Sequence, residues 1–570
     1  MKPAATLHLL VTAALAACAA PPAVGRSSGA AAESHDVVIV STTDVHGRLR
    51  GWDYYADSAE SGRGLSRAAT IVDSVRASNP DRVVLLDAGD LLQGNPFTYV
   101  AARVASDTLN PVIAALNSMR YDAAAIGNHE YNYGVPYLER AIGQAHFPFL
   151  SANTYRADRS RAFRPWTMIE RSGVRIGIIG ATTPGVMVWD AENVRGRVTL
   201  GDIVPAVAAA DREARAAGAN LVIVTVHSGL DEPASYDTVA TALPSENVAA
   251  RLAREIPDID LIVYGHSHKE VREIRIGNTL LMQPKNWATS VGIAHVWMVR
   301  DGKGWRVAES HGEIVPATGH AESPSLLAVT EANHRRTVEY ANTTIGSTPV
   351  AWRGDSARLQ DTPLIDFILE VERRATGADL ASASAFTLDA SLPAGPITVA
   401  QLARLYPYDN TLRALRITGR QLRDYLEFSS RYYRQTENLP AGTRLPIDPK
   451  IAGYNFDMIA GADYTMDLSR PPGYRITSLT VKGRPVVDTD TFTLALNNYR
   501  QSGGGGYAML RDAPVVYDKQ QEIRQLLIDE VRTRKTIRPE DFFTRNWKLV
   551  YPGSSAVGGG LPPAPTPTAR

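Results

Sequence analysis

Five short runs rich in β-branched residues, each leading into a polar residue, constrain the fold of this chain most strongly. The runs are HDVVIVSTTDVHG (35–47), DRVVLLDAGDLLQG (81–94), AAAIGNHEYNYG (123–134), NLVIVTVHSGL (220–230) and DLIVYGHSHKE (260–270). Continuous apolar runs of this length are typical of strands in parallel sheets that are covered on both faces. Helical patterns such as PVIAALNSM (111–119) lie between them, so this half of the chain predicts an α/β fold.

The polar residues at the ends of these runs belong to types that bind divalent metal ions. They are Asp44, His46, Asp90, Asn128, His227, His266 and His268. Ligands of parallel sheets gather in the loops beyond the carboxyl ends of the strands, so five such loops on one rim would bring these side chains together. The donor set suits magnesium, manganese, iron, cobalt or zinc, and it exceeds the needs of one ion. We therefore expect two divalent ions of unknown identity.

A single polar residue after a strand has a simpler explanation. A lone His or Asp at such a position usually caps a turn or satisfies a backbone group. That explanation does not account for the recurrence of these residue types wherever an apolar run ends. Asp87, three residues before Asp90, is interpreted as a strand-end residue and not as a ligand.

Length and charge limit the domain number and the kinds of partner. A chain of 570 residues suggests two or three domains. The 60 basic and 60 acidic residues cancel, so nothing in the net charge favours a nucleic acid polymer or an anionic membrane surface. A phosphate-bearing substrate would have to be attracted locally, by the metals.

Composition divides the chain into segments. We expect a metal-binding domain over residues 35–320, a linker helix over 321–345, and a second domain over 346–551. The linker segment opens with Ser and Pro, which often begin a helix. The last segment, 552–570, is rich in Pro, Gly, Ala and Thr and is expected to be disordered.

The N-terminus has the form of an export signal. Lys2 and the apolar LHLLVTAALAA that follows predict a secretory signal peptide over residues 1–18. Its end, LAAC, resembles a bacterial lipobox, which would make Cys18 the lipidated first residue of the mature protein, with 19–34 as a flexible tether. We therefore expect a periplasmic or cell-envelope protein attached to a membrane through this lipid. The alternative is a plain signal peptide cleaved further on. Cys18 is the only cysteine, so an intramolecular disulfide is impossible.

The second domain offers aromatic and small residues in place of metal ligands. Tyr408 and Tyr499 each sit at a predicted strand-to-loop junction, where a ring can lie flat against a nucleobase. Four glycines at 503–506 let the backbone come close to a ligand or turn sharply. Either tyrosine could instead be a buried core residue.

The ordered motifs carry a specific resemblance. Asp-x-His, Gly-Asp, Gly-Asn-His-Glu, a lone His and Gly-His-x-His, in this order, resemble the calcineurin-like metallophosphoesterases. The resemblance implies a four-layer α/β/β/α sandwich and a phosphoester hydrolase. It also implies that His129 stabilises the transition state or protonates the leaving oxygen. The implied ligands are Asp44, His46 and His268 for one metal, Asn128, His227 and His266 for the other, and Asp90 as the bridge.

The second domain resembles that of the bacterial 5'-nucleotidase family, through its Pro-Tyr-Asp-Asn and Asn-Asn-Tyr-Arg motifs. This implies a C-terminal α/β nucleotide-binding domain in which Tyr408 and Tyr499 sandwich the base and Asn410 contacts it. The family's usual acidic residue in the glycine loop is replaced by Gly505, so a ribose contact is not expected there. A monomer that binds nucleotides is expected.

One substitution indicates the branch of the family. The 5'-nucleotidases carry Gly-Asn-His-Glu-Phe-Asp, whose Asp orients the catalytic His, whereas this chain has Asn132 in GNHEYNYG. An Asn can hold His129 by a hydrogen bond but cannot stabilise its cation as a carboxylate would. Together with GWDYY (51–55) and YNFD (454–457), this resembles the periplasmic 2',3'-cyclic-nucleotide 2'-phosphodiesterases that are also 3'-nucleotidases.

Three alternatives remain open at the level of sequence. One is a 5'-nucleotidase or UDP-sugar hydrolase. Another is a lipoprotein that binds nucleotides without hydrolysing them. The third is a hydrolase of sulfur or sugar-phosphate substrates on the same scaffold, because the metal core determines the reaction type and says little about the substrate.

Overall fold

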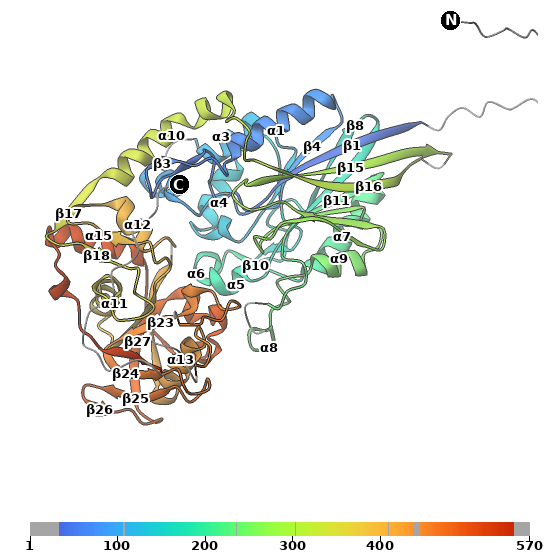
Figure 1. Ribbon diagram of the computed structural model, residues 1–570. Coiled ribbons are helices and arrows are strands. Elements are labelled where there is room, and N and C mark those ends of the chain that lie inside the picture. The colour runs from blue at the N-terminus through green and yellow to red at the C-terminus, as the bar shows by residue number, and fades with distance from the viewer. Residues whose placement is uncertain are drawn as a thin grey trace, which may run out of the picture.

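The computed structural model describes residues 33–105, 109–234, 236, 238–302, 304–408, 410–436 and 445–551. The predicted signal peptide, the lipid-bearing Cys18, nearly all of the tether and the tail from residue 552 lie outside the described residues. The rest forms an N-terminal domain, from β1 to β16, and a C-terminal domain, from β17 to β29. Helix α10 (Pro324–Asn342) connects them along the top of Figure 1.

Two sheets form the centre of the N-terminal domain. The first has the order β16-β15-β1-β4-β5-β6, in which β1, β4, β5 and β6 run parallel. Its strands are β1 (Ser34–Thr42), β4 (Val83–Asp87), β5 (Ala123–Ala125), β6 (Phe149–Leu150), β15 (Ser290–Asp301) and β16 (Gly304–Pro316). The second has the order β13-β14-β12-β11-β9-β8. Its strands are β8 (Trp166–Arg171), β9 (Val174–Thr182), β11 (Leu221–His227), β12 (Leu261–Tyr264), β13 (Val271–Ile276) and β14 (Thr279–Gln283).

Alternating side chains along β1 show how the layers are built. Val37 and Ile39 pack against residues of the second sheet, whereas Val38 and Val40 pack against α1 and α3 on the outer face. The second sheet is covered on its own outer face by α7 and α9. The expected four-layer α/β/β/α sandwich is thereby confirmed. The covering helices are α1 (Leu65–Ser78), α3 (Pro111–Met119), α4 (Val135–Ile142), α7 (Ile203–Ala216) and α9 (Ala249–Glu255).

The five polar-ended runs divide between the two sheets. Three of them form β1, β4 and β5 in the first sheet, and two form β11 and β12 in the second. The rim that we expected to be one sheet edge is therefore made by two stacked sheets. The Thr225 hydroxyl on β11 donates to the Asp87 carbonyl at the end of β4 (2.9 Å), which ties the sheets together beside the rim.

The C-terminal domain is built around a sheet of order β23-β19-β27-β22-β28 and a smaller sheet of order β26-β25-β24-β29. These strands are β19 (Leu380–Ser384), β22 (Thr411–Thr418), β23 (Asp457–Ala460), β24 (Ala462–Asp467), β25 (Ile476–Val481), β26 (Arg484–Pro485), β27 (Thr491–Asn497), β28 (Val515–Glu522) and β29 (Trp547–Val550). The helices are α11 (Pro363–Thr376), α12 (Val399–Leu405), α13 (Gly419–Ser430), α14 (Asn498–Gln501) and α15 (Ile523–Arg534). Its apolar core is separate from those of the N-terminal domain.

Shorter elements complete both domains. In the N-terminal domain these are β2 (Trp52–Asp53), β3 (Ser58–Ala59), α2 (Pro96–Tyr99), η1 (Val100–Val104), η2 (His129–Tyr131), β7 (Thr154–Arg156), α5 (Val186–Trp189), α6 (Ala191–Val194), β10 (Val198–Leu200) and α8 (Thr238–Thr241). In the C-terminal domain these are β17 (Thr344–Thr348), β18 (Trp352–Arg353), β20 (Ser391–Leu392), β21 (Gly395–Thr398), η3 (Gly453–Asn455), η4 (Gly504–Gly506), η5 (Ala508–Leu510) and η6 (Pro539–Asp541).

Helix α10 belongs to both domains. Leu326 near its start lies in the core of the N-terminal domain, and Tyr340 near its end packs against the core of the C-terminal domain. The Tyr340 ring also lies 5.8 Å from that of Tyr99 on α2, whose hydroxyl donates to Gln525 on α15 (3.2 Å). The linker is therefore packed against neighbours on both sides.

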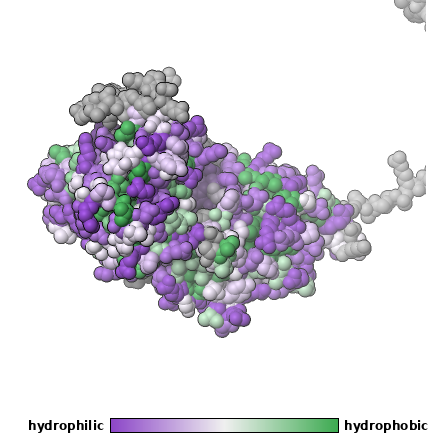
Figure 2. Space-filling view, turned by 90° about the horizontal axis from the view of Figure 1, so that it is seen from below, coloured by the Kyte–Doolittle hydropathy of each residue, from purple (hydrophilic) through white to green (hydrophobic). Residues whose placement is uncertain are grey.

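The face shown in Figure 2 is mostly hydrophilic, with apolar side chains in small patches. Among the described residues, no helix combines the length and apolar character needed to cross a membrane.

Candidate active site

The seven predicted metal ligands lie together at the carboxyl ends of five parallel strands. In chain order they are Asp44 and His46 after β1, Asp90 after β4, Asn128 after β5, His227 at the end of β11, and His266 and His268 after β12. Five of them have a left-handed backbone, which costs a residue with a side chain about 1 kcal/mol or more. These are Asp44 (φ 49°), His46 (φ 49°), Asp90 (φ 63°), His266 (φ 71°) and His268 (φ 54°). The surrounding contacts must hold these loops in place.

The buried Glu130 carboxylate provides much of this support. It accepts hydrogen bonds from the backbone N–H groups of Asp90 (2.9 Å), Leu91 (2.6 Å), Leu92 (2.9 Å) and Gly127 (2.6 Å). The loops after β4 and β5 are thus joined by one side chain. Their approach is close, because a Cβ at position 127 would lie 2.3 Å from Asp90 Oδ1.

Asp44, His46 and His268 form the first group of donor atoms. His46 Nε2 lies 3.0 Å from His268 Nε2, which lies 3.4 Å from Asp44 Oδ1. His46 Nδ1 donates to the Gln93 carbonyl (2.9 Å), so the lone pair of Nε2 faces the group. The three residues have the geometry of a metal site.

The second group surrounds His227. His227 Nε2 lies 3.0 Å from both Asp90 Oδ2 and Asn128 Oδ1, and its Nδ1 donates to the Ala88 carbonyl (2.8 Å). The donor atoms of Asp90, His227 and His266 all lie within 4.8 Å of one another. His266 Nε2 faces Glu246 Oε1 at 3.3 Å, which leaves Nδ1 for this group.

Asp90 lies between the two groups. Its Oδ2 is 3.0 Å from His227 Nε2 on one side and 3.8 Å from His46 Nε2 on the other. Its Oδ1 accepts from the backbone N–H of His129 (2.8 Å). This position suits the bridging role that the resemblance implies.

The electrostatics of the site favour positive charge. Burial raises the pKa of Asp44, but the hydrogen bond from His268 and the nearby His227 outweigh burial and lower it to about 2. Burial lowers the pKa of His227, but Asp90 and Asp44 reverse this and raise it to about 10. Two buried carboxylates therefore hold positive charge at this place, and divalent cations would supply it. The donor set fits two such ions.

His129 stands beside this cluster with its ring partly exposed. Its Nε2 lies 3.9 Å from Asp90 Oδ2, and its Nδ1 lies 2.7 Å from Asn132 Oδ1, as the sequence predicted for an orienting partner. The Asn132 side chain in turn donates to both oxygens of Asp190 (2.8 and 2.9 Å). Position 132 lacks a carboxylate, but Asp190 supplies one as the next group in the hydrogen-bond chain, behind Asn132.

Aromatic rings gather on the C-terminal domain. Tyr408 is 47% exposed and meets the Phe386 ring edge-on at 5.0 Å, so the alternative of a core position is wrong for it. Tyr454 is 41% exposed. Partial burial raises the pKa of Tyr408 and of Tyr499, and Tyr454 adds to both shifts, so the three rings lie near one another. Tyr454 was not singled out from the sequence.

Asn410 and Gly505 lie in the same region, and each has close neighbours. Burial raises the pKa of Tyr406, and the Asn410 side chain lies close enough to its hydroxyl to oppose that shift. Gly505 has a φ of 71°, and a Cβ there would lie 2.3 Å from both Arg500 Nη1 and Asn455 Oδ1. The space of an acidic side chain at position 505 is thus already filled.

A buried ion pair joins the Asn-Asn-Tyr-Arg motif of this domain to its YNFD segment. Arg500 of Asn-Asn-Tyr-Arg donates from Nε and Nη2 to the two carboxylate oxygens of Asp457 (2.7 and 2.8 Å), the last residue of YNFD. Arg500 Nη2 also donates to the Tyr454 carbonyl (2.9 Å). These bonds hold Tyr454 and Tyr499 in one arrangement.

Comparison with known proteins agrees with this architecture. Residues 37–270 match the calcineurin-like phosphoesterase family, and residues 344–512 match the 5'-nucleotidase C-terminal domain. A 2',3'-cyclic-nucleotide 2'-phosphodiesterase/3'-nucleotidase of Haemophilus influenzae is 31% identical over 90% of this chain and 87% of its own length. The chain belongs to the calcineurin-like phosphoesterases that carry a 5'-nucleotidase C-terminal domain.

Two further relatives belong to the same comparison. The trifunctional nucleotide phosphoesterase protein YfkN of Bacillus subtilis is 28% identical over 93% of this chain, which spans only 40% of that longer protein. A Staphylococcus aureus protein solved in complex with alpha-ketoglutarate is 25% identical, with a TM-score of 0.76 over 90% of this chain and 100% of its own.

Calcineurin-like phosphoesterases use two divalent metal ions, and the His/Asp clusters of this phosphoesterase provide donors for them. The structure brings together all seven predicted ligands and His129. Sequence reasoning missed Asp190, Glu246 and Trp189. None of the three follows an apolar strand run, so a search of strand ends does not find them.

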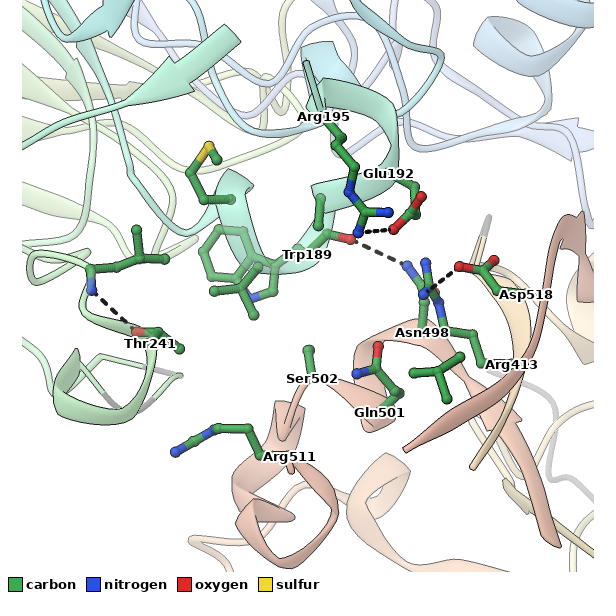
Figure 3. Close-up of a pocket in the computed structure, with 15 residues that line it drawn as sticks. Trp189, Glu192, Arg195, Thr241, Arg413, Asn498, Gln501, Ser502, Arg511 and Asp518 are labelled. Atoms are coloured by element: carbon green, nitrogen blue, oxygen red, sulfur yellow. Dashed lines mark hydrogen bonds and ion pairs between the residues drawn. The ribbon is translucent and has the colours of Figure 1, made fainter. Parts of the chain in front are cut away.

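Trp189 connects the metal cluster of this phosphoesterase with its C-terminal domain. Its ring stacks on His266 (5.5 Å between centroids, 29° between planes), and its carbonyl accepts from Asn498 Nδ2 (3.3 Å). Figure 3 shows this bond at the wall of a cavity of about 670 Å³ that Trp189 and Arg195 line from one domain and Arg413 and Asn498 from the other. Asn498 directly precedes Tyr499.

Proposed function

We propose that this phosphoesterase hydrolyses 2',3'-cyclic nucleotides to 3'-nucleotides and then to nucleoside and phosphate. The observation that carries the proposal is a set of adjacent His/Asp groups that could hold metal ions, with His129 beside them, in a chain whose second domain presents exposed tyrosines. The name and similarity of the Haemophilus influenzae relative support the choice of substrate. Asn132 in place of the Asp of 5'-nucleotidases supports the same choice.

Each site residue has a role in this proposal. We infer that Asp44, His46 and His268 hold one ion, that Asn128, His227 and His266 hold the other, and that Asp90 bridges them. When bound, the two ions would activate a water molecule and offset charge on the phosphate oxygens. His129 Nε2, beside Asp90, can stabilise the charge that develops or give a proton to the departing 2'-oxygen. Tyr408 and Tyr499 would bind the base, with Asn410 near them.

The cellular setting belongs to the same proposal. The enzyme would be a monomer that is anchored at the cell envelope through a lipid on Cys18. It would hydrolyse nucleotides outside the cytoplasm. The lipobox-like LAAC supports the anchor. Labelling with radioactive palmitate tests it, because an unlabelled mature protein would exclude a lipid on Cys18.

The main experiment compares substrates with one enzyme preparation. Release of phosphate or nucleotide is measured from 2',3'-cyclic AMP, 3'-AMP and 5'-AMP with Mn²⁺ or Co²⁺, with and without a chelator. We expect the first two to be preferred and the chelator to abolish hydrolysis of both. A clear preference for 5'-AMP would favour the 5'-nucleotidase alternative, which the matched C-terminal domain supports. No hydrolysis of any nucleotide would favour a nucleotide-binding lipoprotein.

Removing the stacking rings tests the base site. Tyr408→Ala and Tyr499→Ala should each raise KM for the nucleotide about 5- to 150-fold, since stacking contributes about 1 to 3 kcal/mol per base. Tyr474→Ala is the matched control, because Tyr474 is 72% exposed between β24 and β25. An unchanged KM in both site variants would exclude base stacking.

A further inference from the structure

Asn132 presents a problem that an aspartate at the same position would not have. A carboxylate offers an oxygen to His129 in either orientation, but an amide can turn either its oxygen or its NH₂ group toward the ring. Only the oxygen accepts from an Nδ1–H. An amide turned the other way would donate to a bare Nδ1, so the ring would stay neutral with its only proton on Nε2, the nitrogen beside Asp90.

Asp190 removes this ambiguity. The carboxylate is 7% exposed, and its Oδ1 accepts from Asn132 Nδ2 (2.8 Å) and Asn193 Nδ2 (2.9 Å), while its Oδ2 accepts from Asn132 Nδ2 (2.9 Å). A carboxylate only accepts hydrogen bonds, so Asn132 must point its NH₂ group at Asp190. Asn132 Oδ1 then faces His129, and the 2.7 Å contact requires an N–H on Nδ1.

Asp190 itself is held in place by hydrogen bonds of the surrounding segments. The backbone N–H of Asp190 donates to the Val186 carbonyl (2.9 Å), and the backbone N–H of Asn193 donates to the Asp190 carbonyl (2.8 Å). Asn193 Nδ2 also donates to the Asn132 carbonyl (3.1 Å), so the two segments are fastened at two points. The short helices α5 and α6 therefore present Asp190 in one orientation.

We propose that Asp190 is a positioning residue that fixes the orientation of the Asn132 amide and through it keeps His129 Nε2 turned toward Asp90. The inference rests on the proposed function only in requiring that His129 takes part in phosphoester hydrolysis, whichever nucleotide is the substrate. It also explains how the chain works without the carboxylate at position 132.

The proposed role of Asp190 predicts that an aspartate introduced alone at position 132 lowers the activity. Asn132→Asp would place two carboxylates at hydrogen-bond distance with no amide between them, and like charges in a buried site repel strongly. In the variant that combines Asn132→Asp with Asp190→Asn, the carboxylate at position 132 again accepts from His129. The amide at position 190 then donates to that carboxylate. The exchange therefore rebuilds the same network in reverse order.

The test measures kcat and KM on the nucleotide that the wild-type enzyme hydrolyses fastest. Asp190→Asn should lower kcat about 10- to 100-fold with little change in KM, as loss of an orienting partner does. Asn132→Asp should also be impaired, and the exchange variant should recover most of the lost kcat. Asp211→Asn, at a buried aspartate on α7 paired with Arg215, is the matched control and should keep wild-type activity.

Two further measurements separate positioning from a structural role. In a His129→Ala background, adding Asp190→Asn should cause no further loss, because the two residues act through one another. Nuclear magnetic resonance of protein with ¹⁵N-labelled histidine should show His129 protonated on Nδ1 in the wild type and the exchange variant, and a changed tautomer in Asp190→Asn. An additive loss with His129→Ala, an unchanged tautomer, or a failed exchange would each overturn the inference. A wild type that prefers 5'-AMP would refute the substrate proposal alone.

Discussion

The absence of a side chain at Gly504 determines where the ring of Tyr499 can lie. A Cβ at position 504 would lie 2.5 Å from the Tyr499 carbonyl oxygen and 2.6 Å from its Cε2. Both distances are far below van der Waals contact, and the backbone atom cannot move away easily. The ring can occupy its observed place only while residue 504 is glycine.

We therefore expect Gly504→Ala to displace the Tyr499 ring. KM for the nucleotide should rise several-fold, approaching that of Tyr499→Ala, while kcat changes less because the metal cluster lies on the other domain. Gly302→Ala is the matched control, since a Cβ there meets nothing within 4 Å. Steady-state kinetics of the two variants decide the matter, and equal KM values would argue against a role for this ring.

At the scale of elements, helix α11 shows how buried acids connect distant segments. Near its start, Asp361 accepts from the backbone N–H of Asn546 (2.9 Å) and Asp366 accepts from that of Thr544 (2.9 Å), just before β29. Burial, and then the charge of Asp361, raise the pKa of Asp366 to about 8. The folded chain thus keeps a proton on this pair that the unfolded chain releases at lower pH.

This pair makes stability depend on pH. Because the folded state binds the extra proton between the ordinary pKa of 3.8 and about 8, the free energy of unfolding falls as pH rises through that window. The loss is on the order of 1 kcal/mol per pH unit. Asp366→Asn should flatten this slope, so that the variant melts above the wild type at pH 8 and gains less at pH 5.

Thermal melting at several pH values measures the effect. Asp488→Asn is the matched control, because Asp488 is exposed in the same domain. If Asp366→Asn and the wild type lose stability in parallel between pH 5 and pH 8, Asp366 does not carry the proton.

At the scale of the whole molecule, the described residues form two domains with separate apolar cores. One core contains residues from Ile345 to Trp547, and the cores of the N-terminal domain contain none of these. All seven predicted ligands belong to the N-terminal domain. Contacts that join the described parts of the two domains include the ion pair of Arg103 with Glu522 (3.5 Å) and the hydrogen bond of Asn498 with Trp189 (3.3 Å).

Metal removal should therefore affect the domains unequally. Ions that bind only the folded N-terminal domain stabilise it by about 2.7 kcal/mol at a concentration of 100 times Kd. Differential scanning calorimetry should show two transitions, of which a chelator lowers mainly that of the N-terminal domain. A single transition, or equal shifts of both, would contradict this expectation.

Much of the site could be predicted because its signals are local. An apolar run followed by Asp, Asn or His identifies a strand end, and parallel strands bring their carboxyl ends to the same edge, so His227 and Asp90 could be expected to meet. The same runs could not show that β1 and β11 belong to different sheets. Alternation of side chains is identical whichever sheet lies opposite.

By itself, the sequence determined the residue types of the metal cluster, the order of its loops and the two-domain plan. Only the tertiary structure decided which distant groups contact the residues of the site. Asp190 is 58 residues from Asn132, and Trp189 is 309 residues from Asn498, yet each pair is joined by a hydrogen bond. Local patterns reflect how each segment folds, whereas the partner of a buried polar group depends on which distant segments pack together.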